Sequence, residues 1–103
     1  MYIVCVTSCP TGIAHTFMAA ANLKKAGNKM GIEIKIETQG AGGTENKITE
    51  DDLKRADGVI VASDVSINDA ERFDKLPVLE CGVSEAISDP EGIIKELIEG
   101  IDK

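Results

Sequence analysis

A cysteine at position 9 follows an apolar stretch and precedes an alanine-rich one. The segment around it reads Thr7-Ser8-Cys9-Pro10-Thr11-Gly12-Ile13-Ala14-His15-Thr16. A cysteine that leaves a strand and faces the start of a helix lies among free backbone N–H groups, which favour its thiolate together with the helix dipole. The same N–H groups bind phosphate. A nucleophile and an anion site at one point predict phosphoryl chemistry on sulfur.

The residues after Cys9 are of types that bind a phosphoryl group. The backbone N–H groups of residues 11–16 are expected to bind its equatorial oxygens and to stabilise a loose, charge-rich transition state. Gly12 lets the backbone fold closely around the anion. Thr11 and Thr16 offer hydroxyl groups. His15 either adds a donor or a positive charge or merely caps and packs the helix, and the sequence leaves both interpretations open.

The spacing of these residues also raises a second class of enzyme. Cys9, followed after five residues by His15-Thr16, nearly matches the Cys-x5-Arg-Ser/Thr loop of protein tyrosine phosphatases. Those enzymes hold phosphate with the arginine fork and hydrolyse the cysteinyl phosphate with an aspartic general acid. Histidine in place of arginine removes the bidentate fork. The loop therefore favours transfer of the phosphoryl group over its hydrolysis.

Size, charge and cysteine content exclude several other classes. A chain of 103 residues with a net charge of −7 predicts one domain, residues 1–103, and no nucleic-acid partner. No apolar run is long enough to span a bilayer and no signal peptide is recognisable, so we expect a cytoplasmic protein without membrane insertion. The three cysteines have no metal-like spacing, and neither a metal nor a cofactor is expected. We predict Cys5 as a core residue and leave open whether Cys81 lies near the site.

Strand and helix patterns alternate along the chain. Apolar runs at residues 2–6 and 59–62 predict strands buried on both faces, and residues 77–79 predict a brief fourth strand. Alternation over residues 32–36 predicts a strand with one wetter face at the sheet edge. Glycine-rich residues 39–43 are expected to form a loop. Helices are predicted from Ile13 to near Gly27, over residues 49–56 behind a capping box, over residues 68–73, and from Pro90 onward.

This alternation predicts an α/β fold with an open, mostly parallel sheet and helices on both faces. In such sheets ligands bind beyond the carboxyl ends of the strands. Cys9, Thr38-Gln39 and Asp64 would all lie at that edge. We therefore expect Gln39, Gly40 and Asp64 to form the rim of the site.

The same segments resemble the IIB domain of the fructose class of the phosphoenolpyruvate-dependent sugar phosphotransferase system (PTS). The first matching block, residues 9–20, is highly specific. The later blocks are weaker alone but fall in the right order, and they comprise Glu37-Thr38-Gln39-Gly40, Ile48-Thr49, residues 56–60, Ala62-Ser63-Asp64 and Arg72-Phe73.

The resemblance implies both a fold and an activity. The fold would be a three-layer α/β/α sandwich, Rossmann-like, with a four-stranded parallel sheet in the order 2-1-3-4. Cys9 would take a phosphoryl group from a phosphohistidine of a IIA domain. It would pass this group to fructose or a related sugar held by the membrane-embedded IIC domain, at the inner face of the membrane. The family's phosphate loop carries over to Pro10, Thr11, Gly12, Ile13, Ala14, His15 and Thr16.

The chain departs from the family pattern outside this loop. The family usually has an acidic residue at position 21 or 22, a serine at Ala41 and Gly-Lys at Asp74-Lys75. Phosphoryl acceptance is still expected, whereas the partners and the sugar stay open. Two alternative functions also stay open: a small cysteine-dependent phosphatase and a regulatory module that senses phosphorylation.

Overall fold

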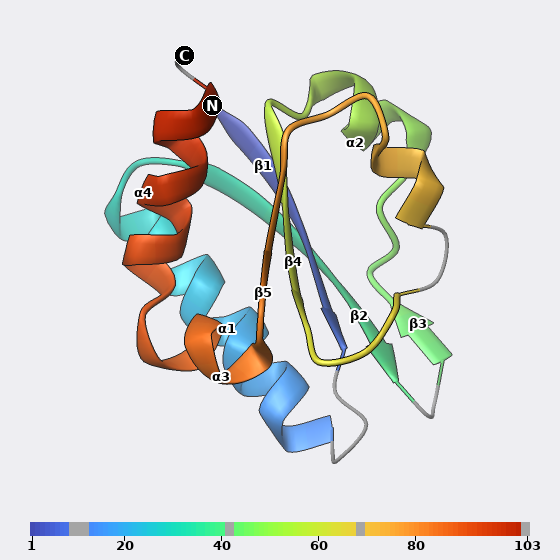
Figure 1. The fold of residues 1–103 in the computed structure, drawn as a ribbon, viewed down its shortest axis with the longest axis vertical. Coiled ribbons are helices and arrows are strands. Elements are labelled where there is room, and N and C mark those ends of the chain that lie inside the picture. The colour runs from blue at the N-terminus through green and yellow to red at the C-terminus, as the bar shows by residue number, and fades with distance from the viewer. Residues whose placement is uncertain (9–12, 41–42, 68–69, 102–103) are drawn as a thin grey trace.

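The chain folds into a mixed five-stranded sheet with helices on both faces (Figure 1). The computed structural model describes residues 1–8, 13–40, 43–67 and 70–101. The elements in chain order are β1 (Tyr2–Ser8), α1 (Ile13–Lys29), β2 (Glu33–Gly40), β3 (Gly43–Glu45), α2 (Glu50–Arg55), β4 (Gly58–Ser63), the 3-10 turn η1 (Ala70–Phe73), β5 (Val78–Cys81), α3 (Val83–Ser88) and α4 (Pro90–Ile101).

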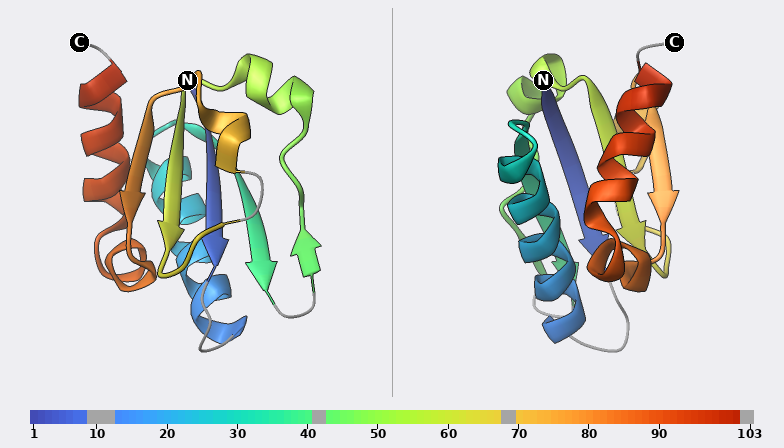
Figure 2. Two further views of the ribbon diagram at one scale, coloured as in Figure 1. Left: turned by 45° about the vertical axis from the view of Figure 1, so that its right-hand side comes forward. Right: turned by 90° about the vertical axis from the view of Figure 1, so that its left-hand side faces the viewer.

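The sheet has the order β3-β2-β1-β4-β5. Strands β2, β1, β4 and β5 are parallel neighbours, while β3 pairs antiparallel with β2 and points the opposite way in the left view of Figure 2. The predicted four-stranded parallel sheet with the order 2-1-3-4 is therefore wrong, because a fifth, antiparallel strand completes it. The predicted edge position of β2 is also wrong, since β3 lies outside it.

The additional strand arises in the stretch that was expected to be a loop. Strand β2 continues to Gly40, and Gly40 pairs with Gly43 at the start of β3. A separation of two residues is typical of a tight β-hairpin, for which glycine is as well suited as it is for an open loop. Glycine content alone therefore did not distinguish a loop from a strand reversal.

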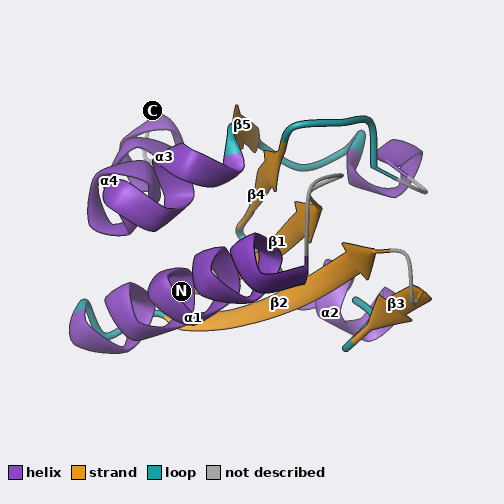
Figure 3. Ribbon diagram, turned by 90° about the horizontal axis from the view of Figure 1, so that it is seen from below, coloured by secondary structure: helices purple, strands orange, loops and turns teal. Residues whose placement is uncertain are grey.

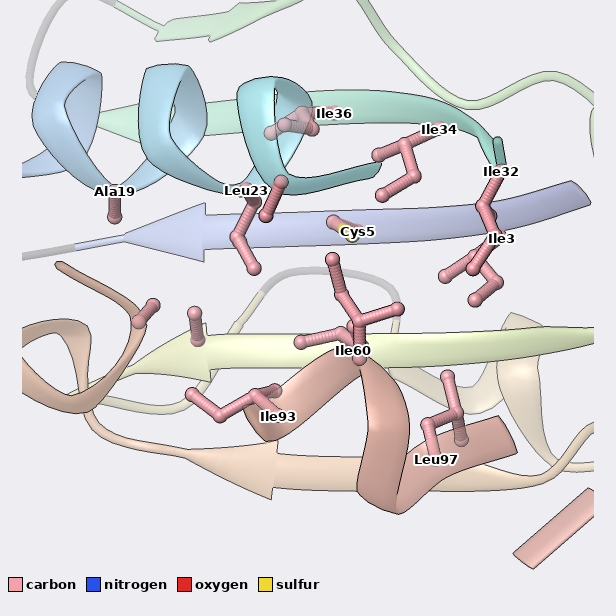
Figure 4. Close-up of a cluster of buried hydrophobic side chains, with 14 of the residues drawn as sticks. Ile3, Cys5, Ala19, Leu23, Ile32, Ile34, Ile36, Ile60, Ile93 and Leu97 are labelled. Atoms are coloured by element: carbon pink, nitrogen blue, oxygen red, sulfur yellow. The ribbon is translucent and has the colours of Figure 1, made fainter. Parts of the chain in front are cut away.

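Apolar side chains pack on both faces of the sheet. Helices α1, α3 and α4 cover one face, and α2 and η1 lie over the other (Figure 3). Strand β1 is buried on both sides, as its apolar run predicts, because successive side chains point to opposite faces. Cys5 is fully buried among Leu23, Ile36 and Ile60 (Figure 4), so its prediction as a core residue is confirmed.

Two of the predicted helix starts are confirmed by their caps. The Asp52 N–H donates to Thr49 Oγ1 at 3.1 Å, and the Thr49 N–H donates to the Asp52 carboxylate at 2.9 Å, which completes the capping box of α2. The Gly92 N–H donates to Asp89 Oδ1 at 3.2 Å at the start of α4. None of the helices in the described part of the chain has the length and apolarity needed to cross a bilayer.

Candidate functional site

The carboxyl ends of three parallel strands meet at one edge of the sheet. Ser8, the last residue of β1, is in register with Gln39 on β2 and with Ser63 on β4. The Asp64 N–H donates to the Ser8 carbonyl at 3.4 Å. Two predicted rim residues therefore lie beside Ser8: Gln39 is next to last on β2, and Asp64 directly follows β4.

The predicted phosphate loop is described only in part. Cys9, Pro10, Thr11 and Gly12 lie outside the described residues. Helix α1 begins at Ile13, so Ile13, Ala14 and His15 belong to its first turn, as predicted, although only their backbone is described. Thr16 is buried on α1, Gln39 is buried, Gly40 ends β2 and Asp64 is exposed after β4.

A buried ion pair lies beside Gln39. Glu37, two residues earlier on the same face of β2, is only 1% exposed. Arg72 on η1 donates to both of its carboxylate oxygens, from Nη1 at 2.9 Å and from Nη2 at 2.5 Å. Gln39 Nε2 donates at 2.7 Å and the Ile48 N–H at 2.9 Å. Glu37 therefore ties the end of β2 to η1 and to the segment after β3.

The charge of this pair is fixed by its hydrogen bonds. Burial by itself raises the pKa of the Glu37 carboxyl, but hydrogen bonds from Arg72, Gln39 and Ile48 outweigh burial and hold the pKa below its usual range. Glu37 is therefore ionised at neutral pH and is no proton donor. The bidentate pair commits the Arg72 guanidinium to Glu37, so a structural role at the rim follows for both residues.

The sequence reasoning singled out the two motifs that hold this pair but did not join them. Glu37 and Arg72 are 35 positions apart. The sequence did contain a signal for such a pair. Glu37 continues the predicted strand into the site, and a buried glutamate needs a cation beside it.

Neither of the two described cysteines is prepared for nucleophilic attack. Burial raises the pKa of the Cys5 thiol far above its usual range. Burial, together with the carboxylates of Glu85, Asp64 and Glu96, raises the pKa of the half-buried Cys81 thiol to about 11. Both are protonated at neutral pH, whereas the thiolate is the nucleophile in cysteine chemistry.

Two grooves border β4 and β2, the strands that flank β1. One, of about 910 Å³, runs along β4 and β5 beneath η1; it includes Ser63, and its charged lining residues are all acidic: Asp64, Glu71, Asp74 and Glu80. The other, of about 630 Å³, lies between α1 and β2–β3 and includes Thr38, the half-exposed Phe17 and the cations Lys24 and Lys25. Within the described ranges no three side chains are grouped to hold a metal ion.

Comparison with known proteins gives consistent matches across the chain. A family profile described as "PTS system, Lactose/Cellobiose specific IIB subunit" matches residues 4–96. The "PTS system fructose-like EIIB component 1" of Escherichia coli K12 is 43% identical over 99 residues, which are 96% of this chain and 92% of that protein. The solution structure of an Enzyme IIB subunit of the PTS from Escherichia coli K12 has a TM-score of 0.90 at 42% identity, covering 98% of this chain and 94% of that one.

Some similar proteins are much longer. The "PTS system 2-O-alpha-mannosyl-D-glycerate-specific EIIABC component" of Escherichia coli K12 is 47% identical over 96 residues, or 93% of this chain. The chain spans only 15% of that protein's length, 62% of a fructose-specific EIIB component from Haloferax volcanii and 16% of an EIIB'BC component from Xanthomonas campestris.

Proposed function

The chain belongs to the PTS IIB family, in its fructose class, and from this premise we propose that it is a phosphocarrier that forms a phosphocysteine at Cys9. Residues 1–103 form one IIB domain in this proposal. The supporting observation is the placement of the three cysteines. Cys5 and Cys81 lie on strands β1 and β5, and the pKa of each thiol is raised. In the sequence, Cys9 directly follows the last residue of β1 and comes four positions before the first residue of α1.

The proposed reaction has two transfers at one sulfur. The Cys9 thiolate attacks a phosphohistidine of a IIA domain, so that a P–N bond breaks, a P–S bond forms and the histidine nitrogen is released. A sugar hydroxyl then attacks phosphorus, a P–O bond forms, the P–S bond breaks to release the Cys9 thiolate, and the hydroxyl proton passes to water. Backbone N–H groups at the start of α1 stabilise the transferring group.

The proposed site residues are the nucleophile, the phosphate loop and the rim. The loop, which carries no arginine, binds the phosphoryl group through backbone N–H groups and the threonine hydroxyls. Gln39 and Gly40 at the end of β2, and Asp64 after β4, border it. The phosphate-binding residues are Pro10, Thr11, Gly12, Ile13, Ala14, His15 and Thr16.

The proposed partners are a IIA donor and a IIC domain that holds the sugar. Support comes from the relative named as an EIIABC component, which is 47% identical to this chain. Relatives named for fructose and for mannosyl-glycerate favour fructose or a related sugar as the acceptor. The domain would act in the cytoplasm, at the inner face of the membrane that contains IIC.

Phosphoryl transfer from phospho-IIA, with the modified residue located by mass spectrometry, tests the proposal. Cys9→Ser should abolish the transfer while leaving the fold intact, since a serine hydroxyl is scarcely ionised at neutral pH. Cys81→Ser is the matched control, and it should be phosphorylated at the wild-type rate. Undiminished acceptance by Cys9→Ser would remove Cys9 from the mechanism.

Two further measurements separate the alternative functions. The wild-type protein should hydrolyse an aryl phosphate negligibly, because the loop has histidine where a phosphatase has its arginine fork. Vigorous hydrolysis would support the phosphatase interpretation. Phosphoryl acceptance without onward transfer to sugar in IIC-containing vesicles would support a regulatory module.

A further inference from the structure

Thr7 carries a buried hydroxyl without a hydrogen-bond partner. Its side chain is fully buried, and Oγ1 is one of two such unpartnered atoms in the described part of the chain. Burying a hydroxyl without a hydrogen bond costs free energy. Valine has nearly the same shape and lacks this cost. Packing of the core therefore gives no reason for threonine at this position.

Thr7 lies on β1 close to the strand end that leads to the proposed site. Thr7 is the penultimate residue of the strand and comes two residues before Cys9. Side chains on a strand alternate between faces, so Thr7 shares the face of Ile3 and Cys5, which pack beneath α1. Helix α1, which begins at Ile13, packs on that same face. The hydroxyl thus lies on the face of the sheet that carries α1, close to the carboxyl end of β1.

The flanking strands do not relieve the unpartnered hydroxyl. Thr7 is in register with Thr38 on β2 and with Ala62 on β4. Ala62 has no polar side-chain atom, and the half-buried Thr38 makes no hydrogen bond to Thr7. A partner that is present only in the reactive state of the site would account for the hydroxyl.

We propose that the Thr7 hydroxyl donates a hydrogen bond to the anion formed at Cys9, first the thiolate and then the phosphoryl group. This inference rests on the proposed phosphocarrier function. A hydroxyl that lacks a partner in the resting protein and gains a charged one in the reactive state stabilises that state selectively. The unfavourable burial of Oγ1 is then offset when the site is charged.

Two substitutions separate the hydroxyl from the packing of the side chain. Thr7→Val keeps the shape and removes the hydroxyl, whereas Thr7→Ser keeps the hydroxyl and removes a methyl group. The pKa of the Cys9 thiol is measured from the pH dependence of its alkylation, with the alkylated residue identified by mass spectrometry. Phosphoryl acceptance from phospho-IIA and the thermal midpoint are measured on the same variants.

Thr7→Val should raise the thermal midpoint, raise the Cys9 thiol pKa by about one unit and slow phosphoryl acceptance by roughly 10- to 100-fold, as expected for one hydrogen bond to a charged group. Thr7→Ser should lower the thermal midpoint while its thiol pKa and transfer rate stay near those of the wild type.

Three outcomes would overturn the inference. They are an unchanged Cys9 thiol pKa in Thr7→Val, equal pKa shifts in both variants, and a lower thermal midpoint for Thr7→Val, which would show that the fold itself uses the hydroxyl. Alkylation needs no phosphoryl donor, so the thiol pKa tests the role of Thr7 independently of the proposed phosphocarrier function. Failure of wild-type Cys9 to accept phosphate from phospho-IIA would instead refute the proposed function.

Discussion

Replacing Glu37 with glutamine would leave Arg72 as a buried cation without its anion. Glu37 is 1% exposed, and the Arg72 side chain is 13% exposed in the ion pair. Both carboxylate oxygens accept from the guanidinium, at 2.9 and 2.5 Å. The amide of glutamine has nearly the same size, but it has no charge and turns one acceptor into a donor. Volume is therefore conserved, and the change isolates electrostatics and hydrogen bonding.

The expected loss of stability is large for a domain of this size. Removing one partner of a buried ion pair costs about 3–5 kcal/mol, because the remaining charge is left uncompensated. Domains of about 100 residues have unfolding free energies of about 5–15 kcal/mol. Glu37→Gln should therefore lower the thermal midpoint by roughly 15–25 °C. Adding Arg72→Met should recover part of this loss, since it removes the stranded charge.

The same strand offers a matched control. Glu33 on β2 accepts from Arg55 at 2.7 Å, but both side chains of this pair are 61% exposed. Exposed pairs contribute about 0–1 kcal/mol, so Glu33→Gln should change stability by less than about 1 kcal/mol. Urea unfolding followed by circular dichroism measures both variants. Equal costs for Glu37→Gln and Glu33→Gln would refute the argument that burial makes the Glu37 pair important.

Two further predictions concern packing and pH. Gly27→Ala should destabilise the fold by about 1–3 kcal/mol, because the added Cβ would lie too close to Ile34 Cδ1. Gly100→Ala on α4 has open space around it and should stabilise the fold by up to about 1 kcal/mol. Urea unfolding measures both variants. Acid should destabilise the protein as the pH falls below about 4, because two carboxyl groups have lowered pKa values in the folded state. Hydrogen bonds, chiefly from Lys35, hold the pKa of Asp52 well below its usual range. Burial raises the pKa of Glu37, but its hydrogen bonds outweigh burial and lower it. Thermal melts between pH 7 and pH 3 test this, and a midpoint that does not fall with pH would contradict it.

Elements whose pattern is local were predictable from the sequence. The apolar run of β1, the capping box at Thr49 and the Asp89-Pro90 start of α4 each specify their structure within a few residues. Strand β3 and helix α3 were missed for a physical reason. They are three and six residues long, too short for a periodic pattern, and they form through tertiary contacts.

The candidate site was predictable where it depends on topology alone. Parallel strands place their carboxyl ends at one edge, and this places Gln39 and Asp64 beside Ser8. The pairing of Glu37 with Arg72 was not predictable in the same way. It depends on how η1 packs over the sheet, and neither residue's own segment specifies that packing.

The two ends of the sheet differ in whether every buried polar atom has a hydrogen-bond partner. At the amino end, Asp52 accepts from the Tyr2 hydroxyl at 2.9 Å, from Lys35 Nζ at 2.5 Å and from the Thr49 N–H at 2.9 Å. At the carboxyl end, the described part of the chain holds two buried polar atoms without a partner, Thr7 Oγ1 and Arg72 Nε. Unsatisfied groups reduce stability, so their location at the site end is hard to explain by folding alone. Such groups are expected where a site binds a ligand or a charged intermediate, because the binding supplies what the resting structure lacks. The two unpartnered polar atoms of the described residues thus lie at the end of the sheet at which phosphoryl transfer is proposed.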